Sequence, residues 1–348
     1  MLTNMKILLI SDAWRPQVNG VVRTLEYTCS ELTALGHQVQ VIGPDRFRTV
    51  PMPGYREIPL ALMPGRGVEK AIETSGPDCI HIATEGPLGM AARRWCMHNQ
   101  VAFTTSYHTR FPEYLRLRAP VPTRLSYAWL RRFHGKAQRT MVRTRTQKKE
   151  LSARGWANLE VWPGGVDIEL FRPRRERALR LPGPIALYVG RVAPEKTLDD
   201  FLRVQFPGSK VVIGDGPARH ALEARFPDAH FLGLQHGEKL ARLMASADVF
   251  VFPSRTDTLG LVMLEAMACG VPVAAFPVPG PLDVVLDGVS GCLDHDLVAA
   301  MERALRLDRC DCRAFAAEFS WQHCSRIFLD LVQPIAELPP AMSHAALS

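Results

Sequence analysis

One stretch of the sequence, residues 253–276, constrains the fold more than any other. It reads PSRTDTLGLVMLEAMACGVPVAAF and joins two apolar runs, VFVF at 249–252 and VPVAAF at 271–276. The intervening residues 259–270 have the length of a short helix, which Gly270 would close as a C-terminal cap with Pro272 just beyond. The stretch therefore predicts a strand, a loop, a helix and a second strand, as in a βα-alternating sheet.

Glu265 is the exception within this predicted helix. Eleven of the twelve residues at 259–270 are apolar or glycine, so all faces of the helix are expected to be buried. A buried carboxylate needs a partner, because burying an unpaired charge costs several kcal/mol. Asp257 lies eight residues earlier, in a loop whose backbone N–H groups, with those of the first helical turn, suit an anion. We expect the unit to bind a phosphorylated sugar through Asp257 and Glu265; a structural glutamate bonded to nearby backbone is the alternative.

Length and composition are those of an ordinary globular protein. The 348 residues favour two domains, and 47% of them are hydrophobic and 22% charged. No apolar run approaches the roughly 18 residues of a membrane span, and the run at 5–10 is too short for a signal peptide. Eight cysteines show no CxxC pair and no zinc-finger spacing, so we expect reduced, mostly buried thiols and a cytosolic location.

The positive charge is concentrated in one segment. Residues 110–149 hold twelve Lys or Arg and one acid, a net charge of +11 that leaves −4 for the rest of the chain. Aromatic and leucine side chains are interleaved with these cations. The pattern fits an anionic membrane surface or nucleic acid better than a solvated face, which is the usual interpretation of a charge run.

The N-terminal residues predict the first strand–helix–strand unit of a parallel sheet. A strand at 6–10 is followed by a loop, a helix at about 21–35 and a strand at 39–42. The loop lies at the carboxyl end of its strand, where open α/β sheets bind ligands, and Gly20 would let a phosphate or sugar approach the backbone. The GxGxxG fingerprint is absent, which argues against a nicotinamide oxidoreductase.

Other polar side chains also follow predicted strands. His108 comes after a strand at 101–106, and Arg191 and Lys196 flank the turn after a strand at 185–189. The two cations suit a diphosphate, although surface charges on a loop are the alternative. Residues 172–184 are basic, with Pro and Gly, and are the expected linker between two βα-alternating halves. A ligand site in the crevice between the halves is expected.

Several segments together resemble family 4 glycosyltransferases, retaining enzymes with the GT-B fold of two Rossmann-like domains facing across a cleft. DTLGLVMLE (257–265) is similar to the acid–x7–acid motif of that family, and VNGVVRTLE (18–26) to its N-terminal glycine loop. YHTRF (107–111) carries a histidine where the family places one near the reacting sugar. The remaining matches are the diphosphate turn YVGRVAPEK (188–196), VVIGDGP (211–217) and LEAMACGVPV (264–273). PSRTDT, PQVNGVVRTL and SYHTRFPEYLRLR look most similar to bacterial members that glycosylate lipids.

The resemblance implies a role for each part of the chain. Residues 1–172 would bind the acceptor and 173–333 the nucleotide sugar, with a last helix at about 313–331 returning to the first domain and a tail at 334–348. The donor would be held by Gly20, Arg191, Lys196, Asp257, Leu259, Gly260, Leu261 and Glu265. The catalytic set would be Arg191, Lys196, Asp257 and His108, in which the two cations neutralise the leaving diphosphate.

The implied chemistry needs neither a covalent nucleophile nor a cofactor. No metal is expected, because Arg191, Lys196 and the helix N-terminus meet the charge of the diphosphate. Attachment to the inner face of the cell membrane would use Arg110, Arg116, Arg118, Arg131, Arg132 and Lys136.

The expected function is transfer of a hexose or hexuronic acid from a UDP- or GDP-sugar to a lipid acceptor such as diacylglycerol. The same chemistry on a soluble sugar or glycan is one alternative. A nucleic-acid-binding module is a distant one, since it leaves Glu265 and the Arg191–Lys196 turn unexplained; no nucleic acid is expected as a partner.

The chain departs from the family pattern at four places. Asp257 stands where Glu is more common, and Leu259 where many members have Phe. Residues 163–167 (PGGVD) lack the basic residue often found just before Gly-Val-Asp, and residues 279–281 (PGP) replace a Gly-Gly turn. The sequence Asp294-His295-Asp296 has the spacing of a metal-binding DxD motif but is expected to be a surface turn.

Overall fold

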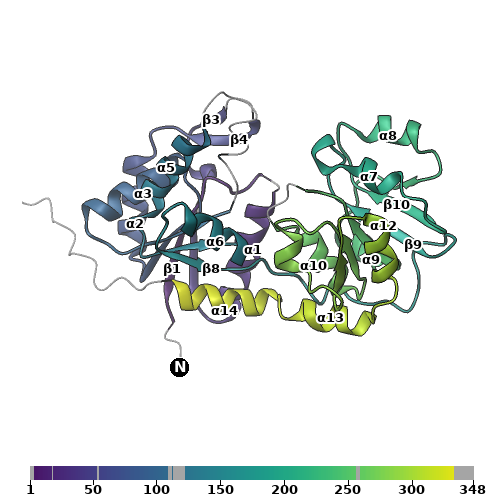
Figure 1. The fold of residues 1–348 in the computed structure, drawn as a ribbon. Coiled ribbons are helices and arrows are strands. Elements are labelled where there is room, and N and C mark those ends of the chain that lie inside the picture. The colour runs from purple at the N-terminus through teal and green to yellow at the C-terminus, as the bar shows by residue number, and fades with distance from the viewer. Residues whose placement is uncertain are drawn as a thin grey trace, which may run out of the picture. The chain divides into compact units, whose positions relative to one another are not determined.

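The computed structural model describes residues 4–17, 19–52, 55–108, 112, 122–255 and 259–332, without the side chains of residues 55–58. The chain divides into two compact units. The first comprises Met1–Pro163 together with Cys324–Ser348, and the second is Gly164–His323 (Figure 1). Each unit is built around its own six-stranded sheet, in which every strand pairing is parallel.

The sheet of the first unit has the strand order β2-β1-β5-β6-β7-β8. The elements of this unit are β1 (Lys6–Ile10), α1 (Gly20–Ala34), β2 (Gln38–Ile42), η1 (Pro44–Arg46), β3 (Thr49–Met52), β4 (Tyr55–Ala61), α2 (Gly65–Ser75), β5 (Cys79–Ile82), α3 (Pro87–His98), β6 (Thr104–Tyr107), α5 (Thr123–His134), β7 (Arg139–Val142), α6 (Arg145–Ala153), β8 (Leu159–Val161) and, from Cys324 onward, α14 (Trp321–Leu331).

Alternation along β1 feeds two separate cores on the two faces of this sheet. Leu8 and Ile10 pack with residues of α2, α3 and α5 on one face. Ile7 and Leu9 pack on the other face with α1 and with Phe328 and Leu329 of α14. All of these β1 side chains are buried, as expected for a central parallel strand covered on both sides (Figure 1).

The second sheet has the order β11-β10-β9-β12-β13-β14. Its unit contains β9 (Ile185–Val189), η2 (Pro194–Lys196), α7 (Leu198–Leu202), β10 (Ser209–Ile213), α8 (Arg219–Arg225), β11 (His230–Phe231), α9 (Gly237–Ala245), β12 (Val249–Phe252), α10 (Leu261–Ala268), β13 (Val273–Ala275), α11 (Pro281–Val284), β14 (Gly291–Leu293), α12 (Leu297–Ala304) and α13 (Arg309–Ala317).

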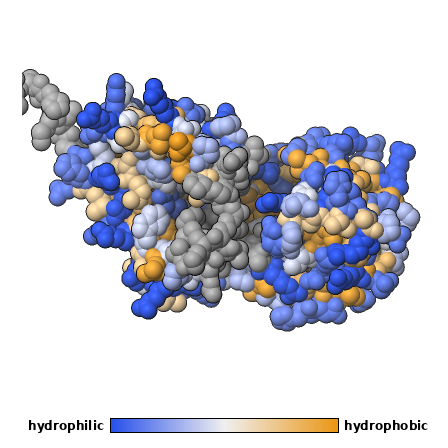
Figure 2. Space-filling model, turned by 90° about the horizontal axis from the view of Figure 1, so that it is seen from above, coloured by the Kyte–Doolittle hydropathy of each residue, from blue (hydrophilic) through white to orange (hydrophobic). Residues whose placement is uncertain are grey.

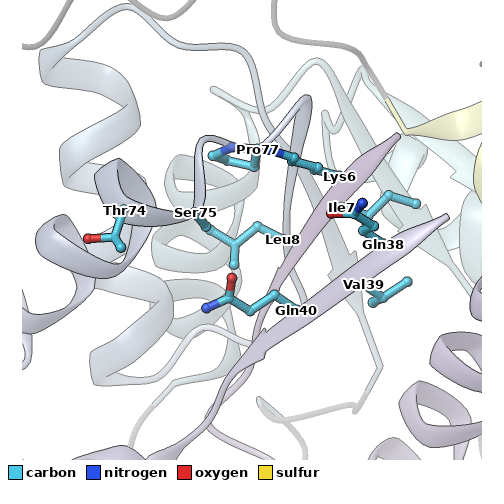
Figure 3. A pocket seen from close by; sticks show the side chains of 9 residues that line it. All are labelled: Lys6, Ile7, Leu8, Gln38, Val39, Gln40, Thr74, Ser75 and Pro77. Carbon is cyan, nitrogen blue, oxygen red and sulfur yellow. The ribbon is translucent and has the colours of Figure 1, made fainter. Parts of the chain in front are cut away.

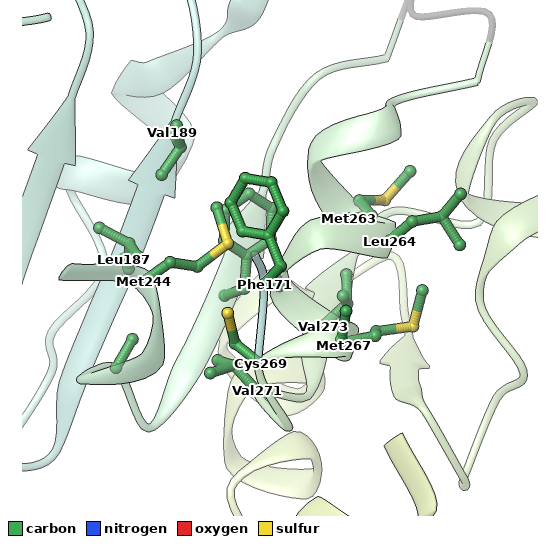
Figure 4. Close-up of a cluster of buried hydrophobic side chains, with 14 of the residues drawn as sticks. Phe171, Leu187, Val189, Met244, Met263, Leu264, Met267, Cys269, Val271 and Val273 are labelled. Carbon is green, nitrogen blue, oxygen red and sulfur yellow. The ribbon is translucent and has the colours of Figure 1, made fainter. Parts of the chain in front are cut away.

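The largest core of the second unit lies between its sheet and α9 and α10. Leu187 and Val189 of β9 meet Met244 of α9 and Met263 and Leu264 of α10 there (Figure 4). The apolar helix that the sequence predicted at 259–270 is therefore observed, although it is shorter, as α10. Gly270 follows it with a φ of +71°, the left-handed conformation of a C-terminal glycine.

A hollow lies at the amino ends of β1 and β2. The loops that follow these strands lie at their opposite ends. It has a volume of about 350 Å³ and is lined by Lys6, Gln38, Gln40, Thr74 and Pro77, among others (Figure 3). Ligand sites of open α/β sheets form at the opposite, carboxyl edge. The candidate site is therefore expected at the carboxyl ends of the strands and not in this hollow.

The boundary between the units differs from the expected position at residue 172. Val166 and Phe171 belong to the core of the second unit, so the chain changes unit at Pro163–Gly164. The segment 172–184, expected as the linker, lies within the second unit, where Leu179 is buried and its N–H approaches the Ser246 hydroxyl.

The expected single helix at 313–331 is in fact two helices, α13 and α14, which end and begin on either side of residues 318–320. Only α14 contributes to the first unit. In addition, the basic segment contains the strand β7, which the sequence analysis had not predicted. No helix in the described ranges combines the length and the apolarity that crossing a membrane requires.

Candidate functional site

In the second unit, the turn after β9 meets the stretch that follows β12. The two strands are parallel neighbours, with Phe250 opposite Leu187, so their carboxyl ends lie at the same sheet edge. The Thr197 hydroxyl then donates a hydrogen bond of 2.7 Å to the carbonyl oxygen of Pro253. The Arg191–Lys196 turn and the start of the 253–270 stretch are thus joined, as the sequence analysis anticipated for a diphosphate site.

Arg191 and Lys196 both lie in the turn at this edge. Arg191 is 66% exposed, and its Nη1 lies 3.9 Å from a Glu195 carboxylate oxygen, a surface ion pair of little energetic weight. Lys196 ends the 3₁₀ turn η2 and is half-buried. A planar guanidinium beside an ammonium group can neutralise two phosphate groups.

Two glycines let the backbone of the loop after β10 approach the backbone of this turn closely. Gly214 and Gly216 follow β10, with φ of +141° and +156°, and the Val192 N–H donates to the carbonyl oxygen of Asp215 at 2.9 Å. A Cβ on Gly214 would overlap the carbonyl oxygen of Gly190. The sequence GDGP therefore fixes the β9 turn from one side, while Arg191 stays exposed and Lys196 half-buried.

The helix α10 presents its N-terminus toward the loop that precedes it. Gly260 is the N-cap with a φ of +71°, and within the described residues no side chain caps the helix. Leu259 is buried and Leu261 half-buried, while Glu265 is only 5% exposed within the helix. Free backbone N–H groups at the first turn of a helix suit a phosphate, and this role of the α10 N-terminus stays a prediction. Asp257, with Thr256 and Thr258, lies outside the described residues.

Arg255 is a third cation of this region that the sequence analysis missed. Its guanidinium lies 3.6 Å from the centroid of the Phe276 ring and 3.2 Å from the Asp200 carboxylate. Both contacts fix the position of the Arg255 side chain. Its place two residues before Asp257 in the sequence was the available signal.

In the first unit, Gly20 begins α1, where Asn19 caps the helix by accepting from the N–H groups of Val21 and Val22. Gly20 is exposed, and apart from its chain neighbours and its own helix no described atom lies within 4 Å of the place where a Cβ would stand. Packing among the described residues therefore does not require this glycine, and its role toward a ligand stays a prediction.

His108 directly follows β6, and its ring lies 5.8 Å from that of Trp162, which follows β8. Burial, followed by the positive charge of Arg143, lowers the pKa of His108 well below its usual value, and His81 and His134 add to the shift. The imidazole is thus neutral at physiological pH. Nε2 of His108 is buried and has no hydrogen-bond partner within the described residues.

Asp12, two residues after the end of β1, is a buried acid to which the sequence analysis gave no role. Its carboxylate accepts from the N–H groups of Leu88 and Gly89 and from the Thr84 hydroxyl, and so caps α3. Burial raises its pKa, and these hydrogen bonds partly offset the rise. Asp12 fixes the loop geometry at the carboxyl edge of β1.

Only part of the basic segment at residues 110–149 lies at the protein surface. Arg131, Arg132 and Lys136 are exposed, as expected for a membrane contact. Arg143, counted with the same charge run, is instead 6% exposed, because it follows the buried strand β7. Arg110, Arg116 and Arg118 lie outside the described residues.

The remaining candidates for metal or redox chemistry are structural. Asp296 caps α12 and Asp294 pairs with Arg303, so the DxD spacing serves a turn and a helix start. All eight cysteines fall in the described ranges and are free thiols, with Cys310 exposed, Cys29 half-buried and the rest buried. In the described ranges, no cluster of His, Cys, Asp or Glu has the arrangement of a metal site.

Comparison with known proteins identifies the family. Residues 18–170 match the family described as glycosyltransferase family 4, and residues 183–307 match the one described as glycosyl transferases group 1. A GDP-mannose-dependent alpha-mannosyltransferase of Mycobacterium tuberculosis is 30% identical over 319 residues, covering 84% of this chain and 84% of the relative. A sulfoquinovosyl transferase of Arabidopsis thaliana is 34% identical over 268 residues, covering 70% of this chain and 51% of the relative.

A solved structure shares the fold. The crystal structure of Anabaena HepE with UDP and glucose matches 94% of this chain and 99% of its own, with a TM-score of 0.69 at 16% identity. The two parallel α/β units correspond to the two Rossmann-like domains expected from the sequence. The chain therefore belongs to glycosyltransferase family 4 and is a glycosyltransferase with the GT-B fold.

Proposed function

We propose that the protein is a retaining glycosyltransferase that moves a hexose or hexuronic acid from a nucleoside diphosphate sugar to a lipid acceptor at a membrane surface. One observation carries the donor half of the proposal: Thr197 joins the Arg191–Lys196 turn to Pro253, where the loop leading to α10 begins. Two cations and a helix N-terminus that no described side chain caps then lie on one sheet edge.

This arrangement supports departure of a nucleoside diphosphate. Negative charge develops on the diphosphate as the bond to the sugar breaks, and preorganised cations stabilise charge that develops in the transition state. Arg191 and Lys196 would supply this without a metal ion. Glu265 would accept from the ribose hydroxyls and Asp257 from those of the sugar. His108, a neutral side chain that follows β6 in the first unit, would line the sugar pocket.

GDP-mannose is the first donor to test, because the mycobacterial relative, 30% identical, is named as dependent on it. A direct assay would screen GDP- and UDP-sugars against diacylglycerol and against soluble glycans. Transfer to diacylglycerol supports the proposal, whereas transfer to soluble glycans alone would replace the lipid half of it.

The exposed face of α5 supports attachment to a membrane. Leu125 and Trp129 lie one helical turn apart and are 63% and 44% exposed, next to Arg124 and Arg132. Apolar side chains flanked by cations are typical of helices that lie on anionic bilayers. On the face seen in Figure 2, hydrophobic side chains of the first unit reach the surface among hydrophilic ones.

Two substitutions test the donor site. Lys196→Ala removes one counter-charge of the diphosphate, and Glu265→Gln removes the charge but keeps the volume of the buried acid. Each should lower kcat/KM for transfer by at least a hundredfold, the range typical of losing one electrostatic catalytic group. Lys239→Ala, at an exposed site on α9, serves as the matched control and should retain full activity. Full activity in Lys196→Ala or Glu265→Gln would reject the assigned role.

A further inference from the structure

Arg143 is a buried cation that the donor site does not use. It follows β7 directly, just as His108 follows β6 and Trp162 follows β8. These strands are adjacent, with Val142 opposite both Tyr107 and Val161, so the three residues stand at one level of the sheet edge. The Arg143 guanidinium lies 5.5 Å from the Trp162 ring centroid.

Among the described residues, the charge of Arg143 has no counter-ion. Its Nη2 donates a long hydrogen bond of 3.4 Å to the Thr24 hydroxyl, and its Nη1 has no partner within the described residues. No described carboxylate pairs with it. Burial lowers the pKa of the guanidinium to about 10, so it stays protonated at neutral pH. An unpaired buried charge is destabilising, and cations in this position are normally matched by an anion.

The surroundings of Arg143 are those of a ligand site rather than of a core. Nε2 of His108, beside the same Trp162 ring, is a second buried polar atom without a described partner. Thr24 links the guanidinium to the glycine loop, because its hydroxyl donates to the carbonyl oxygen of Gly20 at 2.8 Å. Two buried nitrogens without a described partner therefore stand at this sheet edge, and Thr24 connects one of their side chains, that of Arg143, to the exposed Gly20.

We propose that Arg143, with His108 and Thr24, forms an anion subsite in the first unit that binds a phosphate or carboxylate group of the acceptor. Assigning the anion to the acceptor rests on the proposed function, in which Arg191 and Lys196 of the second unit already neutralise the donor. A guanidinium fork fits either group through paired N–H···O bonds, and an imidazole N–H adds a third donor. Among lipid acceptors, one that carries a phosphate or carboxylate group should therefore be preferred over neutral diacylglycerol.

Binding of simple anions tests the subsite without knowledge of the acceptor. The starting protein is the full chain carrying Arg191→Ala and Lys196→Ala, which removes the donor cations. Inorganic phosphate, glycerol 3-phosphate and glucuronate are titrated calorimetrically at constant ionic strength, with glycerol as the neutral probe. Phosphate or glucuronate should bind, and adding Arg143→Met should weaken that binding about tenfold or more. The preferred anion identifies the acceptor group.

A matched control separates anion binding from structural support. Arg139 lies on β7 and donates to the carbonyl oxygens of Asp330 and Leu331, so Arg139→Met should lower Tm yet keep the anion affinity. Arg143→Met should leave Tm in anion-free buffer unchanged or raised, because it removes an unpaired charge. A fall in Tm with unchanged anion affinity would overturn the subsite.

Two readouts distinguish failure of the subsite from failure of the proposed function. NMR titration of the His108 ring should show its pKa rising when phosphate binds, and Arg143→Met should abolish that rise. GDP and UDP affinity should fall in the protein with Arg191→Ala and Lys196→Ala but not in Arg143→Met. Loss of nucleotide affinity in Arg143→Met would show that Arg143 binds the donor and not the acceptor. Normal nucleotide affinity in the protein with Arg191→Ala and Lys196→Ala would reject the proposed donor site and leave the anion subsite standing.

Discussion

At the scale of single residues, the first unit buries an unusual set of histidines and hydroxyls. His81 of β5 is fully buried, and its ring nitrogens lie 2.8 Å from the Thr104 hydroxyl and 2.7 Å from that of Ser106. Burial, with a smaller effect of His134, lowers the pKa of His81 to about 3. The ring is therefore neutral in the folded protein, while an unfolded histidine titrates near 6.5.

This difference predicts a loss of stability in mild acid. Below about pH 6.5 the unfolded chain binds a proton at His81 that the folded chain does not, so the free energy of unfolding falls as pH falls toward 3. Between pH 7.5 and 5.5 this one group should remove about 1.4 kcal/mol. Urea unfolding at both pH values checks it: His81→Gln should show a pH dependence smaller by about that amount. An equal pH dependence in both proteins would contradict the neutral assignment.

Residue roles were predictable only where a motif carries them. Arg191 and Lys196 follow an apolar strand, and that position alone indicated a sheet-edge site. Arg143 did not stand out, because it sits in a run of cations whose spacing suggests a surface; only the burial of β7 separates it from its neighbours. Asp12 was unassigned since its partners are more than seventy residues away.

At the scale of elements, α14 is attached to the first unit by its apolar face and by its ends. Phe328 is fully buried, with its ring 5.0 Å from those of His81 and Trp162. The Trp162 indole N–H donates to the carbonyl oxygen of Cys324, and Arg139 donates to the last carbonyls of the helix. Such C-terminal capping by a cation complements the helix dipole.

Truncating the central contact of α14 should be costly. Phe328→Ala removes a fully buried ring and is expected to lower the free energy of unfolding of the first unit by about 3–5 kcal/mol. Arg326→Ala, exposed on the same helix, should change it by no more than about 0.5 kcal/mol. Denaturant unfolding monitored by tryptophan fluorescence compares the two. A cost below 1 kcal/mol for Phe328→Ala would show that α14 is not part of this core.

The glycines after β1 and β10 should behave differently on substitution. Gly214→Ala places a Cβ against the Gly190 carbonyl at a φ of +141°, so we expect a drop in Tm and disruption of the Arg191 turn. In Gly20→Ala the added Cβ meets no described atom within 4 Å beyond its own helix and chain neighbours, so Tm should be unchanged while donor affinity falls through steric exclusion of the ligand. Thermal unfolding and nucleotide titration separate the two effects; equal Tm losses would contradict this difference.

The strand–helix order was predictable from apolar runs, whereas element ends were less so. The run at 249–252 coincides with β12, since all four residues are apolar and buried. In contrast, β7 reads RTMV, and its Thr140 hydroxyl is satisfied by Thr105 and Asn158, partners that no local pattern reveals. Likewise, the amphipathic pattern at 313–331 continues through residues 318–320, where the backbone breaks into a turn.

At the scale of the whole molecule, the uneven charge predicts binding to anionic membranes. Arg131, Arg132 and Lys136 are exposed on or just after α5, and replacing all three with Glu should abolish sedimentation with phosphatidylglycerol vesicles at low salt. Replacing Arg172, Arg175 and Arg180 with Glu changes the net charge equally and serves as control, because these exposed residues belong to the second unit and not to the basic segment of the first. Equal release of both variants from the vesicles would show that net charge alone, and not the α5 region, explains the binding. Failure of the wild-type protein to sediment would reject membrane attachment.

The chain passes from one unit to the other twice, at Pro163–Gly164 and at His323–Cys324. During synthesis, the second unit is therefore finished before the first has received α14, although the first begins earlier. The nascent first unit would wait with Ile7, Leu9 and Trp162 uncovered while about 160 residues are added at the ribosome. The later segment would thus complete the earlier fold, and chains released before Cys324 would expose that apolar face to chaperones and proteases.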